Sequence, residues 1–168
     1  MNQFNSFNWD KLLSLYPENS SFNVTEYYNI LCPDFPYFLK NYIETPSLQR
    51  LNGIGLLCGT DYTYLYKNRF YYSRLDHSIA VALIIWNFTK DKKQCIAGLL
   101  HDISTPIFSH VIDFCKGDTL TQTFTEKSTE DFIKNDTILC SLLKQDNIQI
   151  EEVSNYHIYT IADNEIPQ

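Results

Sequence analysis

An apolar run at residues 79–86, IAVALIIW, constrains the fold more than any other feature of the chain. It lies within a longer segment, 76–88, whose apolar residues would cover nearly every side of a helix, as in a helix buried at the centre of a protein. The run is far short of the roughly 20 residues that a membrane-spanning helix requires. A second helix is predicted over 92–103, and the short polar break between the two predicts that they pack as an antiparallel hairpin.

Helical patterns also occur elsewhere in the chain, so the predicted fold class is all-α. Residues 62–75 are aromatic and rich in β-forming side chains, and they predict either one small β-hairpin or an irregular loop. The remaining predicted helices lie at 46–57, 106–116, 120–134 and 137–146.

Charge and cysteine content limit the partners and the compartment. The chain carries 13 Lys and Arg residues against 20 Asp and Glu residues, a net charge of −7, so we expect it to bind neither nucleic acid nor a membrane. Its five cysteines include no CxxC pair, as is typical of reduced thiols in the cytoplasm. Residues 1–20 lack the basic and apolar segments of a secretory signal, so a cytoplasmic location is predicted. The pattern leaves open whether the chain forms a homo-oligomer.

A histidine and an aspartate adjoin in LLHDISTPIFSH, residues 99–110, at the end of the second predicted helix. Carboxylates are rarely buried unless they are paired or bind a metal. In the antiparallel hairpin, His77 and His101 each lie roughly 15–16 Å along a helix from the connection, so they come out level. We therefore expect His77, His101 and Asp102 to reach one cation. The alternative interpretation of His101 and Asp102 is a hydrogen-bonded structural pair.

Two imidazoles and one carboxylate suit a divalent metal ion. The set does not distinguish Fe, Mn, Ni, Co, Zn or Mg, although the two nitrogen ligands favour a transition metal. Three protein ligands would leave positions open for water and substrate, as metal-assisted hydrolysis requires.

Three segments together resemble the HD-domain metal phosphohydrolases, in the branch that includes the deoxynucleoside triphosphohydrolases: TPSLQRL at 45–51, RLDHS at 74–78 and LLHDISTPIFSH at 99–110. The likeness covers about residues 45–115. It implies a helical bundle that binds its metal through an H…HD…D set, and a single HD-type domain over 1–168. Within that domain we expect N-terminal helices and loops at 1–45, the HD core at 46–117 and C-terminal helices at 118–168.

The resemblance implies that a metal-activated water attacks a nucleotide or another small phosphate ester. His77, His101 and Asp102 would be the metal ligands. His110, in the FSH segment, would be a proton donor or a phosphate ligand in the active site. Alternatively, His110 is a helix-face residue hydrogen-bonded to a backbone carbonyl.

The resemblance also makes Arg50 and Arg74 candidates for phosphate contact, to which the guanidinium fork is suited. Arg74 could instead pair with Asp76 or Asp102, and Arg50 could be a solvated helix residue.

Several positions depart from the family pattern. Thr105 and Thr125 stand where the triphosphohydrolases have histidines, and Leu56 stands near a glutamine that helps to recognise the sugar. The fourth metal ligand of the family, a later aspartate, has no matching segment. Asp163 is the only aspartate in the tail IADNEIPQ, and it is either a loop residue or this ligand. We expect the chain to end before the last helices of the family. The alternative functions are therefore a catalytically weak HD module that binds a nucleotide or a partner protein, and a fragment that lacks the fourth ligand.

Overall fold

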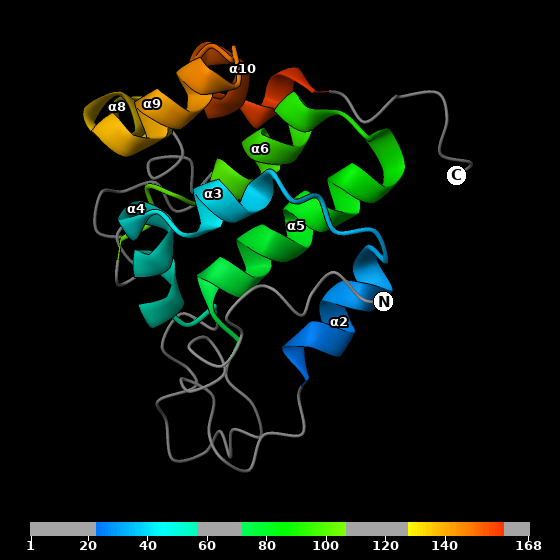
Figure 1. Cartoon of the computed structure of the whole chain (residues 1–168). Helices are drawn as coiled ribbons and strands as arrows, with labels where there is room; N and C mark the ends of the chain where they lie inside the picture. The colour runs from blue at the N-terminus through cyan, green and yellow to red at the C-terminus, as the bar shows by residue number, and fades with distance from the viewer. Residues whose placement is uncertain (1–22, 57–71, 107–127, 160–168) are drawn as a thin grey trace.

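The computed structural model describes residues 23–56, 72–106 and 128–159, and within each of these ranges the chain forms helices joined by short connections (Figure 1). No strand occurs in these three ranges, so the all-α prediction is confirmed there. The α-helices are α2 (Val24–Leu31), α3 (Leu39–Ile43), α4 (Pro46–Gln49), α5 (Arg74–Thr89), α6 (Lys92–Leu100), α8 (Thr129–Asn135), α9 (Thr137–Gln145) and α10 (Glu151–Ser154), and the 3₁₀ turns are η2 (Arg50–Gly53) and η5 (Tyr156–Ile158).

Helices α5 and α6 form the predicted antiparallel hairpin at the centre of the described structure (Figure 1). Helix α5 begins with a capping box, in which Ser73 and Asp76 each bind the other's backbone N–H. It ends at Lys90 in the left-handed conformation, with φ 54°. Asp91 then caps α6 by accepting the backbone N–H groups of Lys93 and Gln94. These local signals reverse the chain within a few residues.

Burial differs between the two central helices in a way that the apolar run did not indicate. Helix α6 is buried at every position from 95 to 100, whereas α5 is exposed at Ile84 (41%) and Phe88 (81%) near its C-terminal end. The prediction that α5 is buried on every side is therefore wrong for its last turns. Helix α6 is covered by α5 on one side and by α10 on another, whereas the end of α5 projects beyond its neighbours (Figure 1).

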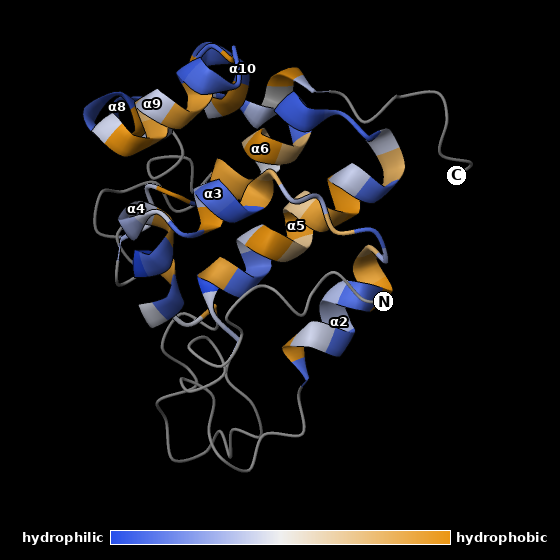
Figure 2. Cartoon of the chain, viewed as in Figure 1, coloured by the Kyte–Doolittle hydropathy of each residue, from blue (hydrophilic) through white to orange (hydrophobic). Residues whose placement is uncertain are grey.

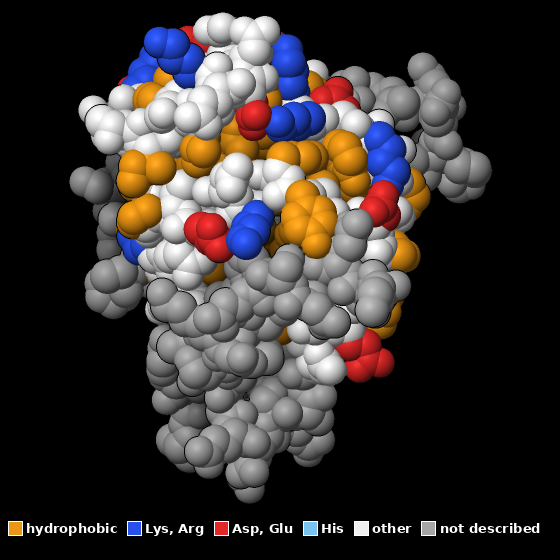
Figure 3. Space-filling view, in the orientation of Figure 1, with side chains coloured by type: hydrophobic (Ala, Val, Ile, Leu, Met, Phe, Trp, Pro, Cys, Tyr) orange, Lys and Arg blue, Asp and Glu red, His pale blue; other side chains and the backbone are white. Residues whose placement is uncertain are grey.

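The other helices pack around this hairpin. Helix α2 packs against α5, where the Tyr28 hydroxyl donates to Asp76 at 2.9 Å, and α10 packs against α6. The Tyr42 hydroxyl of α3 donates to Asp146, just after α9, at 2.8 Å. Hydrophobic residues predominate along α5 and α6 (Figure 2), whereas acidic and basic side chains lie interspersed on the face shown in Figure 3.

The helix predicted over 46–57 is shorter than expected. It is α4 followed by η2, and it ends at Gly53 because Ile54 turns to an extended conformation. Ile54 accepts a hydrogen bond from the backbone N–H of Arg74 at 2.8 Å, and Gly55 forms an antiparallel bridge with Ser73. The β-hairpin predicted within 62–75 falls mostly outside the described residues, and Gly55 is not part of that predicted segment.

The C-terminal predictions are confirmed where the structure describes them. Helix α9 lies within the pattern at 137–146, and α8 coincides with the described end of the pattern at 120–134 and extends one residue beyond it. The helix predicted over 106–116 falls almost wholly outside the described residues. Within the three described ranges, no helix has both the length and the apolar content to cross a membrane.

Candidate metal centre

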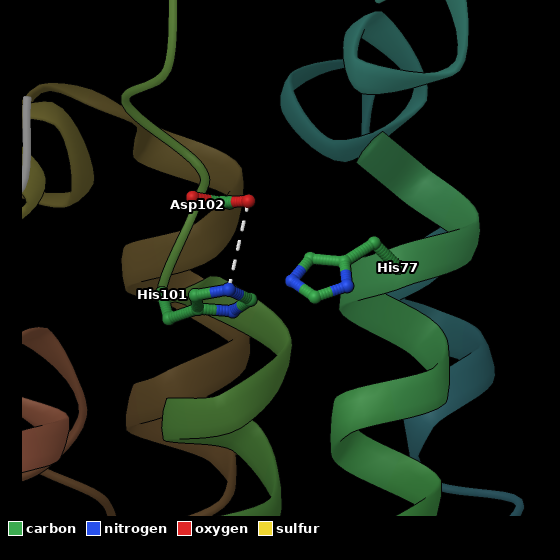
Figure 4. Close-up of side chains that lie close together, drawn as sticks. All are labelled: His77, His101 and Asp102. Atoms are coloured by element: carbon green, nitrogen blue, oxygen red, sulfur yellow. Dashed lines mark ion pairs between the residues drawn. The ribbon is translucent and has the colours of Figure 1, made fainter. Parts of the chain in front are cut away.

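The three predicted ligands converge at one end of the central hairpin (Figure 4). His77 lies in the first turns of α5, and His101 and Asp102 follow directly after α6. The two imidazole rings are 5.2 Å apart between centroids, and His101 Nε2 is 3.5 Å from Asp102 Oδ2. One ligand atom from each residue lies within 4.8 Å of the others. The expected convergence is confirmed; the role of these residues as metal ligands stays a prediction.

A backbone carbonyl fixes the orientation of His101. Nδ1 is 2.7 Å from the carbonyl oxygen of Gly98, which can only accept, so Nδ1 carries the ring proton. In the neutral ring the lone pair is then on Nε2, the atom that faces Asp102. Metal-binding histidines commonly donate their other ring N–H to a carbonyl or a carboxylate in this way.

Asp102 is held by two donors, and its side chain is 12% exposed. Arg74 Nη1 donates to Oδ2 at 2.6 Å, and Thr105 Oγ1 donates to Oδ1 at 3.3 Å. Burial raises the pKa of the carboxyl group, but the charges of His101 and Arg74 outweigh burial and hold that pKa below its usual range. Asp102 is therefore an ionised, oriented carboxylate at neutral pH.

Arg74 lies inside the candidate centre, in contact with Asp102. Its side chain is 3% exposed, and its partner is one of the two acids that the sequence offered as alternatives. Phosphate contact by Arg74 stays a prediction. Its guanidinium adjoins the carboxylate that would bind the metal, so a phosphate seated at the centre would also lie near this positive charge.

Arg50 holds the turn that follows Asp102. Its two terminal nitrogens donate to the carbonyl oxygens of Thr105 at 2.8 Å and Ile103 at 2.6 Å. Its guanidinium also lies over the ring of Phe132, 5.5 Å from the centroid. Arg50 is therefore not a solvated helix residue, and its predicted phosphate contact stays a prediction.

We expect Arg50→Met to weaken metal binding about tenfold, the lower end of the loss that follows when a partner of a metal ligand is removed. The reason is that the carbonyl oxygens of Ile103 and Thr105 lose the hydrogen bonds from Arg50. Thr105 in turn orients Asp102 through its hydroxyl group. Titration calorimetry with Mn²⁺ measures the effect. Lys144→Met, on the exposed face of α9, is the matched control. Equal affinity in both variants would show that the turn does not depend on Arg50.

His77 is half-buried, and its environment favours the neutral ring. Burial lowers its pKa, the charge of His101 lowers it further, and Asp102 opposes the change. A neutral imidazole is the form that binds a metal.

The lowered pKa of His77 predicts acid sensitivity of the metal-free protein. As the pH falls, His77 is protonated near pH 6.5 in the unfolded chain, but only at a lower pH in the folded protein. The contribution of neutral His77 to the free energy of unfolding is therefore complete above pH 6.5. It is lost as the pH falls from there through the pKa of His77 in the folded protein, at up to about 1.4 kcal/mol per pH unit. Urea unfolding at pH 7.5 and 5.5 tests this. His77→Gln should lose less stability than the wild type over this interval, and an equal loss would contradict the prediction.

The donor set fits a divalent transition metal. Two nitrogens and one oxygen around a single ion would lie about 3.4 Å apart, given metal–ligand bonds of about 2.1 Å. The atoms here lie within 4.8 Å of one another, so small side-chain rotations would bring them to that spacing. Arg74 is the competing cation, because it binds Asp102 Oδ2.

Two of the predicted site residues, His110 and Asp163, lie outside the described residues. The sequence analysis also missed two residues that contact His101. Gly98, whose carbonyl orients His101, was missed because a backbone partner leaves no sequence signal. Tyr156, whose ring is 5.9 Å from that of His101, was missed because it lies 55 positions along the chain from this histidine.

Comparison with known proteins adds little to the geometry. No family model matches the chain, and no solved structure matches it significantly. Over 75 residues, 45% of its length, the chain is 37% identical to the uncharacterized protein YdhJ of Bacillus subtilis (strain 168). The matched part is 22% of the length of that protein, so the chain spans only a fraction of its relative.

Proposed function

We propose that the chain is a metal-dependent phosphohydrolase of the HD type that acts on a nucleotide or another small phosphate ester. One observation carries the proposal. His77, His101 and Asp102 meet at one end of the central hairpin, and a hydrogen bond from His101 Nδ1 to Gly98 leaves Nε2 as the ligand atom. A bound divalent ion would lower the pKa of a water ligand and offset charge on the phosphoryl oxygens.

The residues around the three ligands would each have a distinct task. Gly98 fixes the ring of His101, and Thr105 orients Asp102 from the side opposite to Arg74. Arg74 would bind the phosphate and stabilise its negative charge. His110 is expected to donate a proton to the leaving group.

A screen of phosphate esters, run with each of several divalent ions, tests the proposed function. We expect hydrolysis that requires a transition metal and that falls at least 100-fold in Asp102→Asn, because an amide is a poor metal ligand. Asp131→Asn, on an exposed position of α8, is the matched control and should retain full activity. Turnover that does not depend on metal, or that survives in Asp102→Asn, would contradict the proposal.

The ion pair of Arg74 with Asp102 favours a second candidate, a catalytically weak HD module that binds a nucleotide or a partner protein. The Arg74 guanidinium binds the Asp102 carboxylate, which would otherwise be available as a metal ligand. A nucleotide would then raise the melting temperature without being consumed. Phosphate release at an ordinary enzymatic rate would exclude this candidate.

A further inference from the structure

A cavity of about 180 Å³ adjoins the candidate metal centre, and the ring of His101 forms part of its wall. Val81 and Ile85 of α5 line one side, and Tyr156 and Tyr159 line another. Gln94 of α6 also borders the space. The same histidine thus faces Asp102 through Nε2 and borders a cavity with its ring.

The wall is apolar and aromatic. Gln94 supplies the one amide among the described lining residues, and none of these residues is a lysine, an arginine or an acid. The Gln94 side chain donates to Asp91 at 3.2 Å, which leaves its amide carbonyl oxygen as an acceptor for a ligand. A charged phosphate group inside this cavity would lose its hydration and find no cationic side chain among the described lining residues, whereas a neutral ring suits such a wall.

Neighbouring contacts hold two of the wall residues in place. The Tyr156 ring stands nearly perpendicular to that of His101, at an interplanar angle of 85°. The Tyr159 hydroxyl donates to the carbonyl oxygen of Glu152 at 2.6 Å, so this ring is anchored at its polar end. The cavity is therefore bounded by rings whose positions are fixed before a ligand arrives.

The size of the cavity limits what it can hold. An engineered apolar cavity of about 150 Å³ in another protein binds benzene. The present cavity, at about 180 Å³, is therefore large enough for a group of about one ring.

We propose that this cavity binds an apolar or aromatic group of about one ring in the substrate, so that the preferred substrates are phosphate monoesters of such a group and not polyphosphates. The inference rests on the proposed function, because the phosphate would be bound at the metal centre while the ring enters the cavity beside His101.

Two phosphonates that cannot be hydrolysed test the inference on the full chain loaded with Mn²⁺. Phenylphosphonate should bind at least tenfold more tightly than methylphosphonate, because burying a ring contributes at least this much. Val81→Phe fills the cavity and should remove the preference. Ile84→Phe, on the exposed side of the same helix, is the matched control and should retain it. If Val81→Phe does not fold, Gln94→Phe fills the cavity from α6.

Phenol binding to the metal-free protein separates the two possible failures. Equal affinity for the two phosphonates in the wild type would overturn the cavity inference and leave the proposed function standing. A preference that survives both filling variants would also overturn it. If neither phosphonate binds while phenol binds and Val81→Phe abolishes that binding, the proposed function fails and the affinity of the cavity for a ring is supported.

Discussion

Asp102→Ala is expected to destabilise the metal-free protein by about 3 kcal/mol, which is a large fraction of the stability of a small domain. The cause is not the lost attraction alone. Arg74 is 3% exposed and its Nη1 donates to Asp102 at 2.6 Å, so the variant removes a carboxylate that this buried guanidinium binds. Urea unfolding at pH 7.5 measures the change. Asp131→Ala, at an exposed position, should stay within about 0.5 kcal/mol of the wild type.

A double variant separates the buried charge from the lost packing. Replacing both members, as Arg74→Met with Asp102→Leu, removes both charges and should recover most of the stability lost in Asp102→Ala, because apolar replacement of a buried pair is often neutral. If Asp102→Ala costs less than about 1 kcal/mol, the pair is more solvated than its burial indicates. If the double variant is less stable than the single one, the pair stabilises the fold by itself.

His101→Gln is expected to lower the affinity for Mn²⁺ or Zn²⁺ by at least 100-fold. This residue supplies the ligand atom that is best fixed in the structure, since its other nitrogen binds the carbonyl of Gly98 at 2.7 Å. The loss should exceed the 10- to 100-fold that follows removal of a partner of a ligand. Titration calorimetry measures the affinity, and circular dichroism of the metal-free variant shows whether the helices persist. An unchanged affinity would place the metal elsewhere.

The position of the candidate centre could be predicted from the sequence because local signals determine it. The apolar pattern identifies two helices, the short polar break forces them to run antiparallel, and the helical rise sets how far His77 and His101 lie from the connection. The structure brings their rings to 5.2 Å. The helix caps agree with this pattern, since Ser73 starts α5 and Asp91 starts α6.

The partners of the two arginines could not be predicted, because they depend on residues far away in the chain. A guanidinium fits a carboxylate as well as a phosphate, so the residue type does not choose between Asp102 and a substrate for Arg74. Arg50 binds backbone carbonyls 53 and 55 positions away, and a carbonyl is present at every residue. The early end of the helix after Gly53 has a similar cause, because Ile54 accepts a backbone hydrogen bond from Arg74, 20 positions away.

Long-range ¹H–¹⁵N spectra of the imidazole nitrogens, recorded while Zn²⁺ is added, test the metal centre most directly. We predict that Nε2 of His101 and one ring nitrogen of His77 shift together and saturate at one ion per chain, while Nδ1 of His101 keeps its proton. Shifts confined to other histidines, or separate saturation of His77 and His101, would contradict a shared metal ion at this site.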